Sequence, residues 1–272
     1  MTRMLISYGA LFGAALCLLQ IPSLWEREQR ALCLPPEFWD DKIKDTLVVL
    51  DAGHGGVDGG TQGHGILEKQ ATLELTHRVG KELSEAGVRV VMTRGVDVYV
   101  DLEERSATAN RNQASLFVSI HMNADATSVE TNGVETYFCE RKKLGDIVRL
   151  RNSLSIPEGR VFKDKRSELL ATTVHRHVCQ ATGAIDRKVR DSNYLVVMQT
   201  ECPSILVECG YLTNEAEAAK LKDGDYKARL ATALAEGIKT YLGCSKMNPR
   251  RGIVIENAKE TPAALPATVA NP

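Results

Sequence analysis

Between residues 46 and 244, short runs of apolar residues alternate with longer segments in which apolar residues recur at helical spacing. In residues 68–86, for example, Leu75, Val79 and Leu83 lie about one helical turn apart, which predicts an amphipathic helix. Similar periodicity and capping signals predict four further helices, which cover residues 101–113, 167–182 and 225–242 and a short segment that begins with the capping-box pair Asn214 and Glu217.

The short apolar runs are typical of strands, because they are rich in Val, Ile and Leu and are bounded by turn residues. These runs are residues 46–51, 88–93, 115–120, 133–138, 194–198 and 204–208. Alternation of strands with helices predicts an α/β fold. We expect a single domain with a twisted, mostly parallel central sheet of about six strands, flanked by helices on both faces.

Both ends of the chain differ from this domain. Residues 1–22 hold one early charge, Arg3, followed by a long apolar run, which predicts a signal peptide or a membrane anchor. Both interpretations stay open, because the residues at the end of the run are bulky where a cleavage site needs small ones. Residues 23–45 are charged and contain prolines, as a linker would, and residues 245–272 are rich in Pro and Ala, which predicts a disordered tail.

Composition argues against a nucleic-acid partner and against a cysteine zinc site. The 272 residues include 34 basic and 35 acidic side chains, and aromatic residues make up 5%. A nucleic-acid-binding surface needs surplus basic residues or stacking aromatic residues, so we expect no nucleic-acid partner. Contact with a membrane is expected only through the N-terminal segment. The seven cysteines include no C-x-x-C pair, which argues against a cysteine zinc site.

Three predicted strands end on side chains that carry chemistry. The first runs into a glycine-rich turn that contains His54, another ends at His121, and a third ends at Glu208. Glu68 stands at the start of the first predicted helix. Because ligands of open α/β sheets bind at the carboxyl ends of the strands, we expect all four side chains to face one crevice.

These residue types suit a hydrolytic metal site. Two imidazoles and one carboxylate form a common set of protein ligands for catalytic zinc, which His54, Glu68 and His121 provide. A further carboxylate, Glu208, is available to move protons between water and a leaving nitrogen. We expect substrate contacts from Asn123 and Arg190.

The order of the motifs extends this interpretation. Residues 51–56 read DAGHGG, residues 116–124 read LFVSIHMNA, and residues 203–214 read PSILVECGYLTN. With Glu68 and the intervening Met92-Thr93-Arg94, this series resembles the zinc-dependent N-acetylmuramoyl-L-alanine amidases of the bacterial cell-separation type. The resemblance covers residues 47–242, about seven-tenths of the chain. Tyr211 and Thr213 stand where the family usually has Phe and Ser.

The resemblance implies a Zn²⁺ ion on His54, Glu68 and His121, a catalytic Glu208, and a catalytic domain over residues 46–244. It implies a peptidoglycan hydrolase that cleaves the amide between the lactyl group of N-acetylmuramic acid and L-Ala of the stem peptide. Such an enzyme acts in cell-wall remodelling and daughter-cell separation. The expected partners are stem peptides, muropeptides, and an activator or divisome protein. The expected location is the periplasm after export, with a tether if the N-terminal anchor is uncleaved.

Two other functions stay open at this point. One is a zinc carboxypeptidase or endopeptidase that acts on stem peptides, and the other is a non-catalytic peptidoglycan-binding homologue. Several side chains also keep two interpretations. Asp51 either orients an imidazole or caps the glycine turn. Arg187, Lys188 and Arg190 either form a solvated turn or contact acidic groups of a stem peptide, whereas His175 is expected in solvent.

Overall fold

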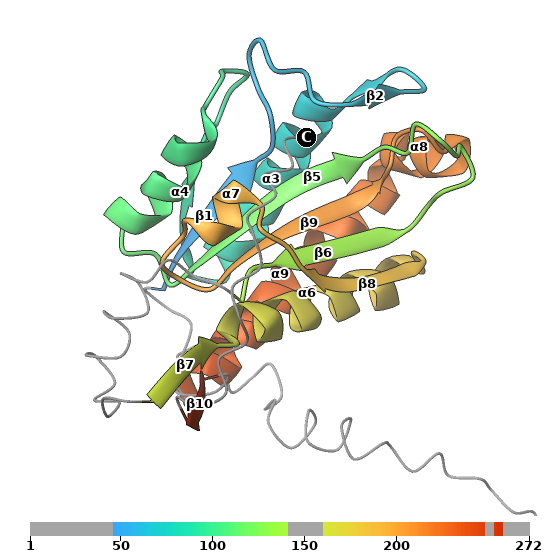
Figure 1. The fold of residues 1–272 in the computed structure, drawn as a ribbon. Coiled ribbons are helices and arrows are strands. Elements are labelled where there is room, and N and C mark those ends of the chain that lie inside the picture. The colour runs from blue at the N-terminus through green and yellow to red at the C-terminus, as the bar shows by residue number, and fades with distance from the viewer. Residues whose placement is uncertain (1–45, 141–159, 248–252, 258–272) are drawn as a thin grey trace, which may run out of the picture. The chain divides into compact units, whose positions relative to one another are not determined.

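The computed structural model describes residues 46–140, 160–247 and 253–257, which form the α/β arrangement in Figure 1. A six-stranded sheet has the order β4-β1-β5-β9-β6-β8. Its strands are β1 (Leu47–Ala52), β4 (Arg89–Met92), β5 (Leu116–Asn123), β6 (Val134–Phe138), β8 (Asp186–Asp191) and β9 (Ser204–Tyr211). Strands β4, β1, β5 and β9 are parallel, whereas β6 is antiparallel to β9 and β8 follows the direction of β6. The predicted mostly parallel α/β sheet is confirmed.

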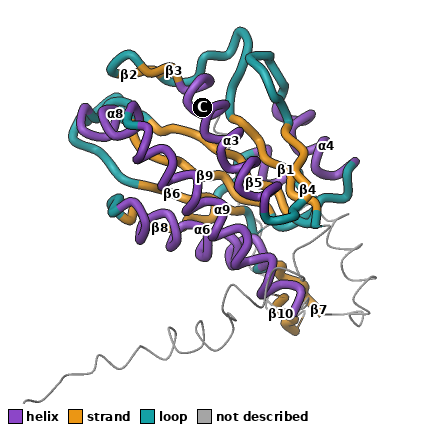
Figure 2. The backbone as a smooth tube through the Cα atoms, turned by 180° about the vertical axis from the view of Figure 1, so that it is seen from behind, coloured by secondary structure: helices purple, strands orange, loops and turns teal. Residues whose placement is uncertain are grey.

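Helices cover both faces of the sheet, as predicted. One face packs against α3 (Glu68–Glu85), α6 (Arg166–Thr182) and α9 (Gly224–Met247), which lie in front of the sheet in Figure 2. The opposite face packs against the shorter α4 (Leu102–Arg111) and α7 (Leu195–Met198). Helix α8 (Glu215–Lys222) begins at Asn214, whose side chain accepts a hydrogen bond from the Glu217 amide. This contact is the N-cap that the sequence predicts.

The short helices α4 and α7 cover only part of their face of the sheet. Their apolar cluster includes Phe117 on β5 and Leu206 on β9, both of which are buried. Further along the same face of these strands, His121 and Glu208 are only partly buried. The sheet therefore provides a covered apolar half and an accessible half at the carboxyl ends of β5 and β9.

Smaller elements complete the described fold. A two-stranded hairpin of β2 (Gln62–Gly63) and β3 (Ile66–Leu67) precedes α3, and β7 (Arg160–Asp164) pairs with β10 (Ile253–Asn257). Strand β10 lies inside the segment for which we expect a disordered tail, at the run Ile-Val-Ile that favours extended backbone. None of the helices described is long and apolar enough to cross a membrane, and the predicted segments 1–22 and 23–45 lie outside the described residues.

Two further expectations about secondary structure are wrong. The run 194–198 is not a strand, because Leu195–Met198 form the helix α7. The neighbouring Val196 and Val197 are both buried, and a single helical turn packed against α4 and β9 permits this. The segment around Arg187–Arg190 is the strand β8 rather than a turn. Its sequence lacks apolar alternation because it lies at the edge of the sheet, where solvent replaces a second neighbouring strand.

Candidate metal centre

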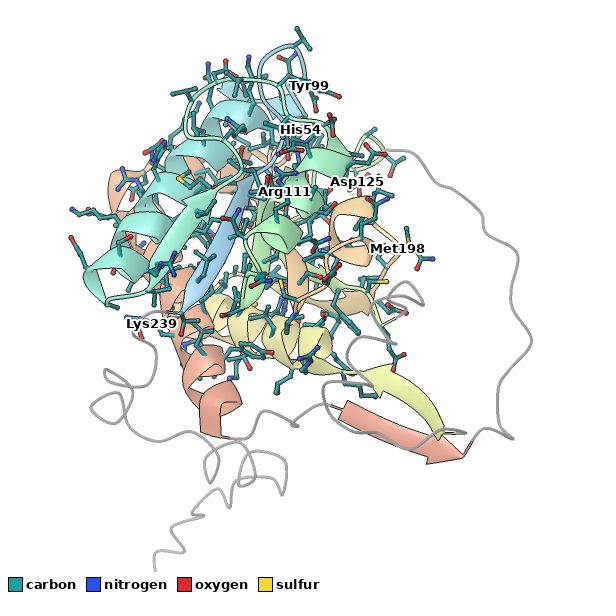
Figure 3. All side chains as sticks on the ribbon, turned by 90° about the vertical axis from the view of Figure 1, so that its left-hand side faces the viewer. His54, Tyr99, Arg111, Asp125, Met198 and Lys239 are labelled. Atoms are coloured by element: carbon teal, nitrogen blue, oxygen red, sulfur yellow. The ribbon has the colours of Figure 1, made fainter. Side chains whose placement is uncertain are left out.

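The four predicted side chains come together at one edge of the sheet. His54 follows β1, Glu68 is the first residue of α3, and His121 lies near the end of β5. The Oε1 atom of Glu68 lies 3.1 Å from Nε2 of His54 and 3.1 Å from Nδ1 of His121. One candidate ligand atom from each residue lies within 4.8 Å of the other two, so the three residues can hold a metal ion. Figure 3 shows His54 at the end of the domain that carries Tyr99, far from Lys239 of α9.

Glycines give the ligands room to approach each other. A Cβ atom on Gly53 would lie 2.4 Å from the His121 ring, and one on Gly60 would lie 2.5 Å from Oε2 of Glu68. His54 itself has a φ of 60°, which is uncommon for a residue with a side chain. The turn is therefore shaped for close contact between the ligands at a cost in backbone strain.

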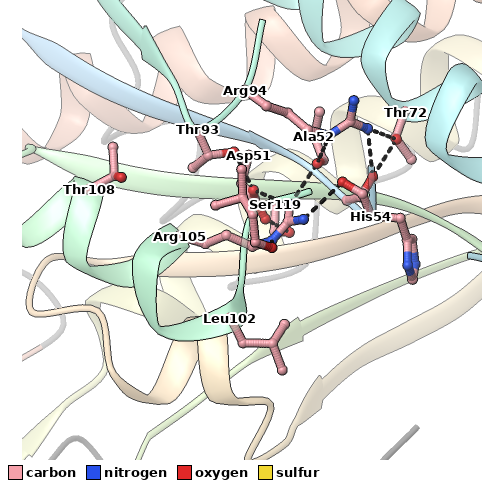
Figure 4. A network of polar contacts seen from close by, with 12 residues as sticks. Asp51, Ala52, His54, Thr72, Thr93, Arg94, Leu102, Arg105, Thr108 and Ser119 are labelled. Atoms are coloured by element: carbon pink, nitrogen blue, oxygen red, sulfur yellow. Dashed lines mark hydrogen bonds and ion pairs between the residues drawn. The ribbon is translucent and has the colours of Figure 1, made fainter. Parts of the chain in front are cut away.

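A buried ion pair holds the strained turn in place (Figure 4). Arg105 of α4 donates from Nη1 to Oδ1 of Asp51 at 2.7 Å and from Nη2 to the His54 carbonyl at 2.8 Å. Asp51 also accepts hydrogen bonds from Thr93 and Ser119. Burial alone would raise the pKa of Asp51, but the Arg105 guanidinium and the two hydroxyl groups bring the pKa below its ordinary value. Asp51 thus supports the turn through Arg105.

A second buried guanidinium connects the turn to α3. Arg94 donates from Nη2 to the carbonyl oxygens of Gly53 and Lys69, both at 2.8 Å, and from Nε to the Ala52 carbonyl at 2.8 Å. Sequence analysis did not assign this role to Arg94 or Arg105. Most of their partners are backbone carbonyls, which leave no mark in a sequence.

The ligands are fixed from behind by hydrogen bonds. The Nδ1 atom of His54 donates to Oδ2 of Asp58 at 2.8 Å, which leaves Nε2 directed toward Glu68. Oε2 of Glu68 accepts from the Thr61 amide at 2.7 Å. Burial would lower the pKa of His54, but Glu68 and Asp58 raise it above its ordinary value. Despite burial, hydrogen bonds from the two histidines hold the pKa of Glu68 well below its usual range. Sequence analysis missed Asp58.

Glu208 stands beside this group on β9. Its Cα atom is the register partner of His121 across the sheet. The Oε2 atom of Glu208 is buried and has no hydrogen-bond partner among the described residues. Burial, supported by the charges of Glu68 and Glu135, raises the pKa of Glu208 to about 7, although the two histidines oppose this shift. The carboxyl group can therefore take up and release a proton near neutral pH.

The two expected substrate contacts share one buried partner. Asn123 donates from Nδ2 to Oε2 of Glu135 at 3.2 Å, and Arg190 lies 3.5 Å from Oε1 of the same carboxylate. Glu135 is 5% exposed and was missed by sequence analysis. The sequence signal for Glu135 is alternation along the strand. Val134 packs into the core, so the next residue points to the opposite face of the sheet.

The expectation that His175 lies in solvent is wrong. It is buried, and its Nδ1 lies 3.0 Å from the Thr136 hydroxyl while its Nε2 lies 2.9 Å from Asp186. The helix α6 turns this histidine toward the sheet, where polar partners on β6 and β8 compensate for its burial.

The donor set passes a chemical test for zinc. Two nitrogen atoms and one carboxylate oxygen converge, as in hydrolytic zinc sites. The partners of His54 and Glu68 fix these side chains in the manner of outer-shell groups around metal ligands. Because the turn has glycines next to the candidate ligands, no side chain there crowds His121 or Glu68. The buried Oε2 of Glu208 lacks a hydrogen-bond partner among the described residues. Fold and site together define an α/β protein whose converging side chains could hold a metal ion of the hydrolytic type.

Comparison with known proteins identifies the family. The sequence pattern of the N-acetylmuramoyl-L-alanine amidase family matches residues 48–240, and the chain belongs to this family. The uncharacterized protein YqiI of Bacillus subtilis is 34% identical over 201 residues, which cover 74% of this chain and 87% of YqiI. N-acetylmuramoyl-L-alanine amidase LytC of the same organism is 32% identical over 71% of this chain but only 35% of LytC.

Solved structures agree with this assignment. The catalytic domain of CwlV, an N-acetylmuramoyl-L-alanine amidase from Bacillus (Paenibacillus) polymyxa var. colistinus, is 34% identical with a TM-score of 0.61. The match covers 72% of this chain and 98% of that domain. The CwlD amidase of Clostridioides difficile, solved with the GerS lipoprotein, is 27% identical with a TM-score of 0.60, covering 73% of this chain and 98% of CwlD.

Proposed function

We propose that the protein is a zinc-dependent N-acetylmuramoyl-L-alanine amidase. It hydrolyses the amide between the lactyl group of N-acetylmuramic acid and L-Ala of the stem peptide. The observation that carries the proposal is the convergence of His54, Glu68 and His121 next to Glu208, whose buried Oε2 has no partner in the described part of the chain. Membership of the amidase family supports the same reaction.

In this proposal His54, Glu68 and His121 hold the zinc ion. When bound, zinc supplies a Lewis acid that polarises a carbonyl group and lowers the pKa of water. Asp58 orients the His54 ring so that Nε2 faces the ion. The Thr61 amide orients the Glu68 carboxylate in the same way.

Glu208 moves the protons of the reaction. As a carboxylate, it takes a proton from the attacking water as the oxygen of that water bonds to the lactyl carbonyl carbon. It then gives the proton to the nitrogen of L-Ala as the carbon–nitrogen bond breaks. The products are a lactyl carboxylic acid and the amine of L-Ala, between which a proton passes to give a carboxylate and an ammonium group, and Glu208 is again a carboxylate. In the metal-free protein, burial raises the pKa of this carboxyl group to about 7. Asn123 and Arg190, which meet at Glu135, contact the substrate beside it.

The biological setting follows from the same assignment. We propose that the protein is exported, by means of residues 1–22, to the periplasm or cell surface, where it remodels the wall during daughter-cell separation. The names of relatives such as the probable cell wall amidase LytH of Staphylococcus epidermidis support this location. An activator or divisome partner is also proposed, with the complex of CwlD and the GerS lipoprotein as a precedent.

Digestion of purified cell wall, with and without a chelator, tests the proposal. We expect release of intact stem peptides with free L-Ala amino groups, identified by mass, and loss of this release when the chelator is present. Shortened stem peptides would instead indicate a carboxypeptidase or endopeptidase. If zinc-loaded protein binds wall fragments but releases nothing, the non-catalytic homologue is the correct interpretation.

A further inference from the structure

A row of charged and polar side chains crosses the open half of the sheet. The Cα atoms of His121 on β5 and Glu208 on β9 are register partners, and Glu208 is in turn the partner of Glu135 on β6. Side chains at paired positions point to the same face of a sheet. The row therefore begins at the candidate metal centre and leads toward the edge strand β8.

A β-bulge lets both Arg187 and Arg190 of β8 face this row. Val134 pairs with Asp186 and Thr136 pairs with Val189, so one residue of β6 faces two residues of β8. The extra residue is accompanied by a φ of 86° at Lys188.

In a regular strand, residues three positions apart, such as 187 and 190, lie on opposite faces of the sheet. Val189 packs against the core beneath α6, whereas Arg187 reaches Glu135 on the opposite face. Arg190 pairs with Tyr137, two positions after Glu135, so the bulge puts Arg190 on the same face as Arg187, a use for which bulges near active sites are known.

Glu135 holds Arg187 and Arg190 in place. Its Oε1 atom lies 3.3 Å from Nε of Arg187 and 3.5 Å from Nη2 of Arg190. The other oxygen accepts hydrogen bonds from the hydroxyl groups of Tyr137 at 2.7 Å and Tyr211 at 3.2 Å. The Glu135 side chain is 6% exposed, while those of Arg187 and Arg190 are 33% and 53% exposed. A fixed anion therefore orients two partly exposed guanidinium groups.

This group retains a capacity to bind an anion. Two guanidinium groups against one carboxylate leave one excess positive charge. Each guanidinium has five N–H donors, of which Glu135 engages only a part. Arg187 also lies over the ring of Tyr211, with its Cζ atom 5.2 Å from the ring centroid, which further restricts its orientation.

We propose that Arg187 and Arg190 form a subsite for a carboxylate of the stem peptide, and that the peptide runs from Glu208 across β6 toward β8. The inference rests on the proposed function, which puts the scissile amide beside Glu208. The Arg187 position lies two strand spacings from Glu208, about 10 Å. Each peptide residue advances a chain by about 3.5 Å, so an acidic side chain two or three residues beyond the scissile bond reaches the arginines.

Binding of the released peptide tests the subsite without requiring turnover. The probes are L-alanyl-glutamate and the same dipeptide with both carboxyl groups converted to amides, titrated into zinc-loaded protein. For the wild type we expect the acid to bind about tenfold or more tightly than the amide, because a charge-assisted hydrogen bond is lost in the amide. Arg187→Gln and Arg190→Gln should each bring this ratio close to one.

Lys188→Gln is the matched control, since it removes the same charge from the same strand. Lys188 is 74% exposed and bonds to Asp186 rather than Glu135. This variant should keep the wild-type ratio, and Arg187→Lys should restore part of it. Equal binding of acid and amide by the wild type would overturn the subsite, as would a ratio unchanged in both arginine variants. Because neither probe contains the scissile amide, absence of wall digestion would count only against the proposed reaction.

Discussion

At the scale of single residues, a variant of Glu208 distinguishes a role in proton transfer from a role as a metal ligand. Glu208 lies outside the group of three converging ligand atoms. We therefore expect Glu208→Gln to keep the zinc content of the wild type, measured by elemental analysis. Release of stem peptides should fall by about a thousandfold, within the range for loss of a general acid–base. Glu215→Gln, at an exposed position of α8, is the control. Loss of zinc from Glu208→Gln would show that Glu208 is a ligand.

The same carboxyl group should make the stability of the metal-free protein depend on pH. The folded-state pKa of Glu208 is raised from 4.5 to about 7, so the folded protein binds a proton more tightly than the unfolded chain. Its contribution to the free energy of unfolding is fully present below pH 4.5 and is lost as pH rises through 7. The contribution is at most about 3 kcal/mol.

Urea unfolding of chelator-treated protein between these pH values measures the effect. The difference in unfolding free energy between the wild type and Glu208→Gln should change with pH, because His54 and the other titrating groups are common to both proteins. A constant difference across this range would show that the pKa of Glu208 is not raised.

At the scale of the elements, α4 supports the turn through one residue. Arg105 is buried and pairs with the buried Asp51. Arg105→Met should lower the free energy of unfolding by about 3–5 kcal/mol, because it leaves a buried carboxylate without its partner. Zinc affinity should fall by about tenfold to a hundredfold, since the His54 carbonyl loses its hydrogen bond.

Arg111→Met is a control on the same helix. The Arg111 side chain is 58% exposed and pairs with Glu104 at the surface. Its loss should leave the free energy of unfolding close to the wild-type value, because solvent screens this surface pair. Thermal unfolding and zinc titration of both variants test this contrast, and equal effects would mean that the Asp51 pair is dispensable.

The elements also show what sequence reasoning can achieve. His54, His121 and Glu208 were placed at one edge because each follows an apolar run, and parallel strands end together. Glu135 was missed because its partners outside β6 come from three other strands, β5, β8 and β9, which only the antiparallel insertion of β6 brings together. The bulge in β8 was missed because a charged edge strand has no apolar period to reveal its register.

At the scale of the whole molecule, a metal ion would connect β1, α3 and β5 within the described domain. A ligand that binds only the folded state raises stability by mass action, by about 4 kcal/mol at a thousandfold excess over its dissociation constant. For a domain of this size we expect zinc to raise the midpoint of thermal unfolding by about 10 °C. A chelator should reverse the shift, and His54→Ala should abolish it. A shift that persists without His54 would place the zinc elsewhere.

The bulge of β8 has a consequence for how this enzyme surface can change over generations. Arg187 and Arg190, three positions apart, share a face because the bulge takes up one additional residue between them, so removal of a single codon at Lys188 would restore regular alternation and still keep both arginines on the Glu135 face, two positions apart. The length of this edge strand would then change, with the arginine pair and every residue of the metal centre left intact.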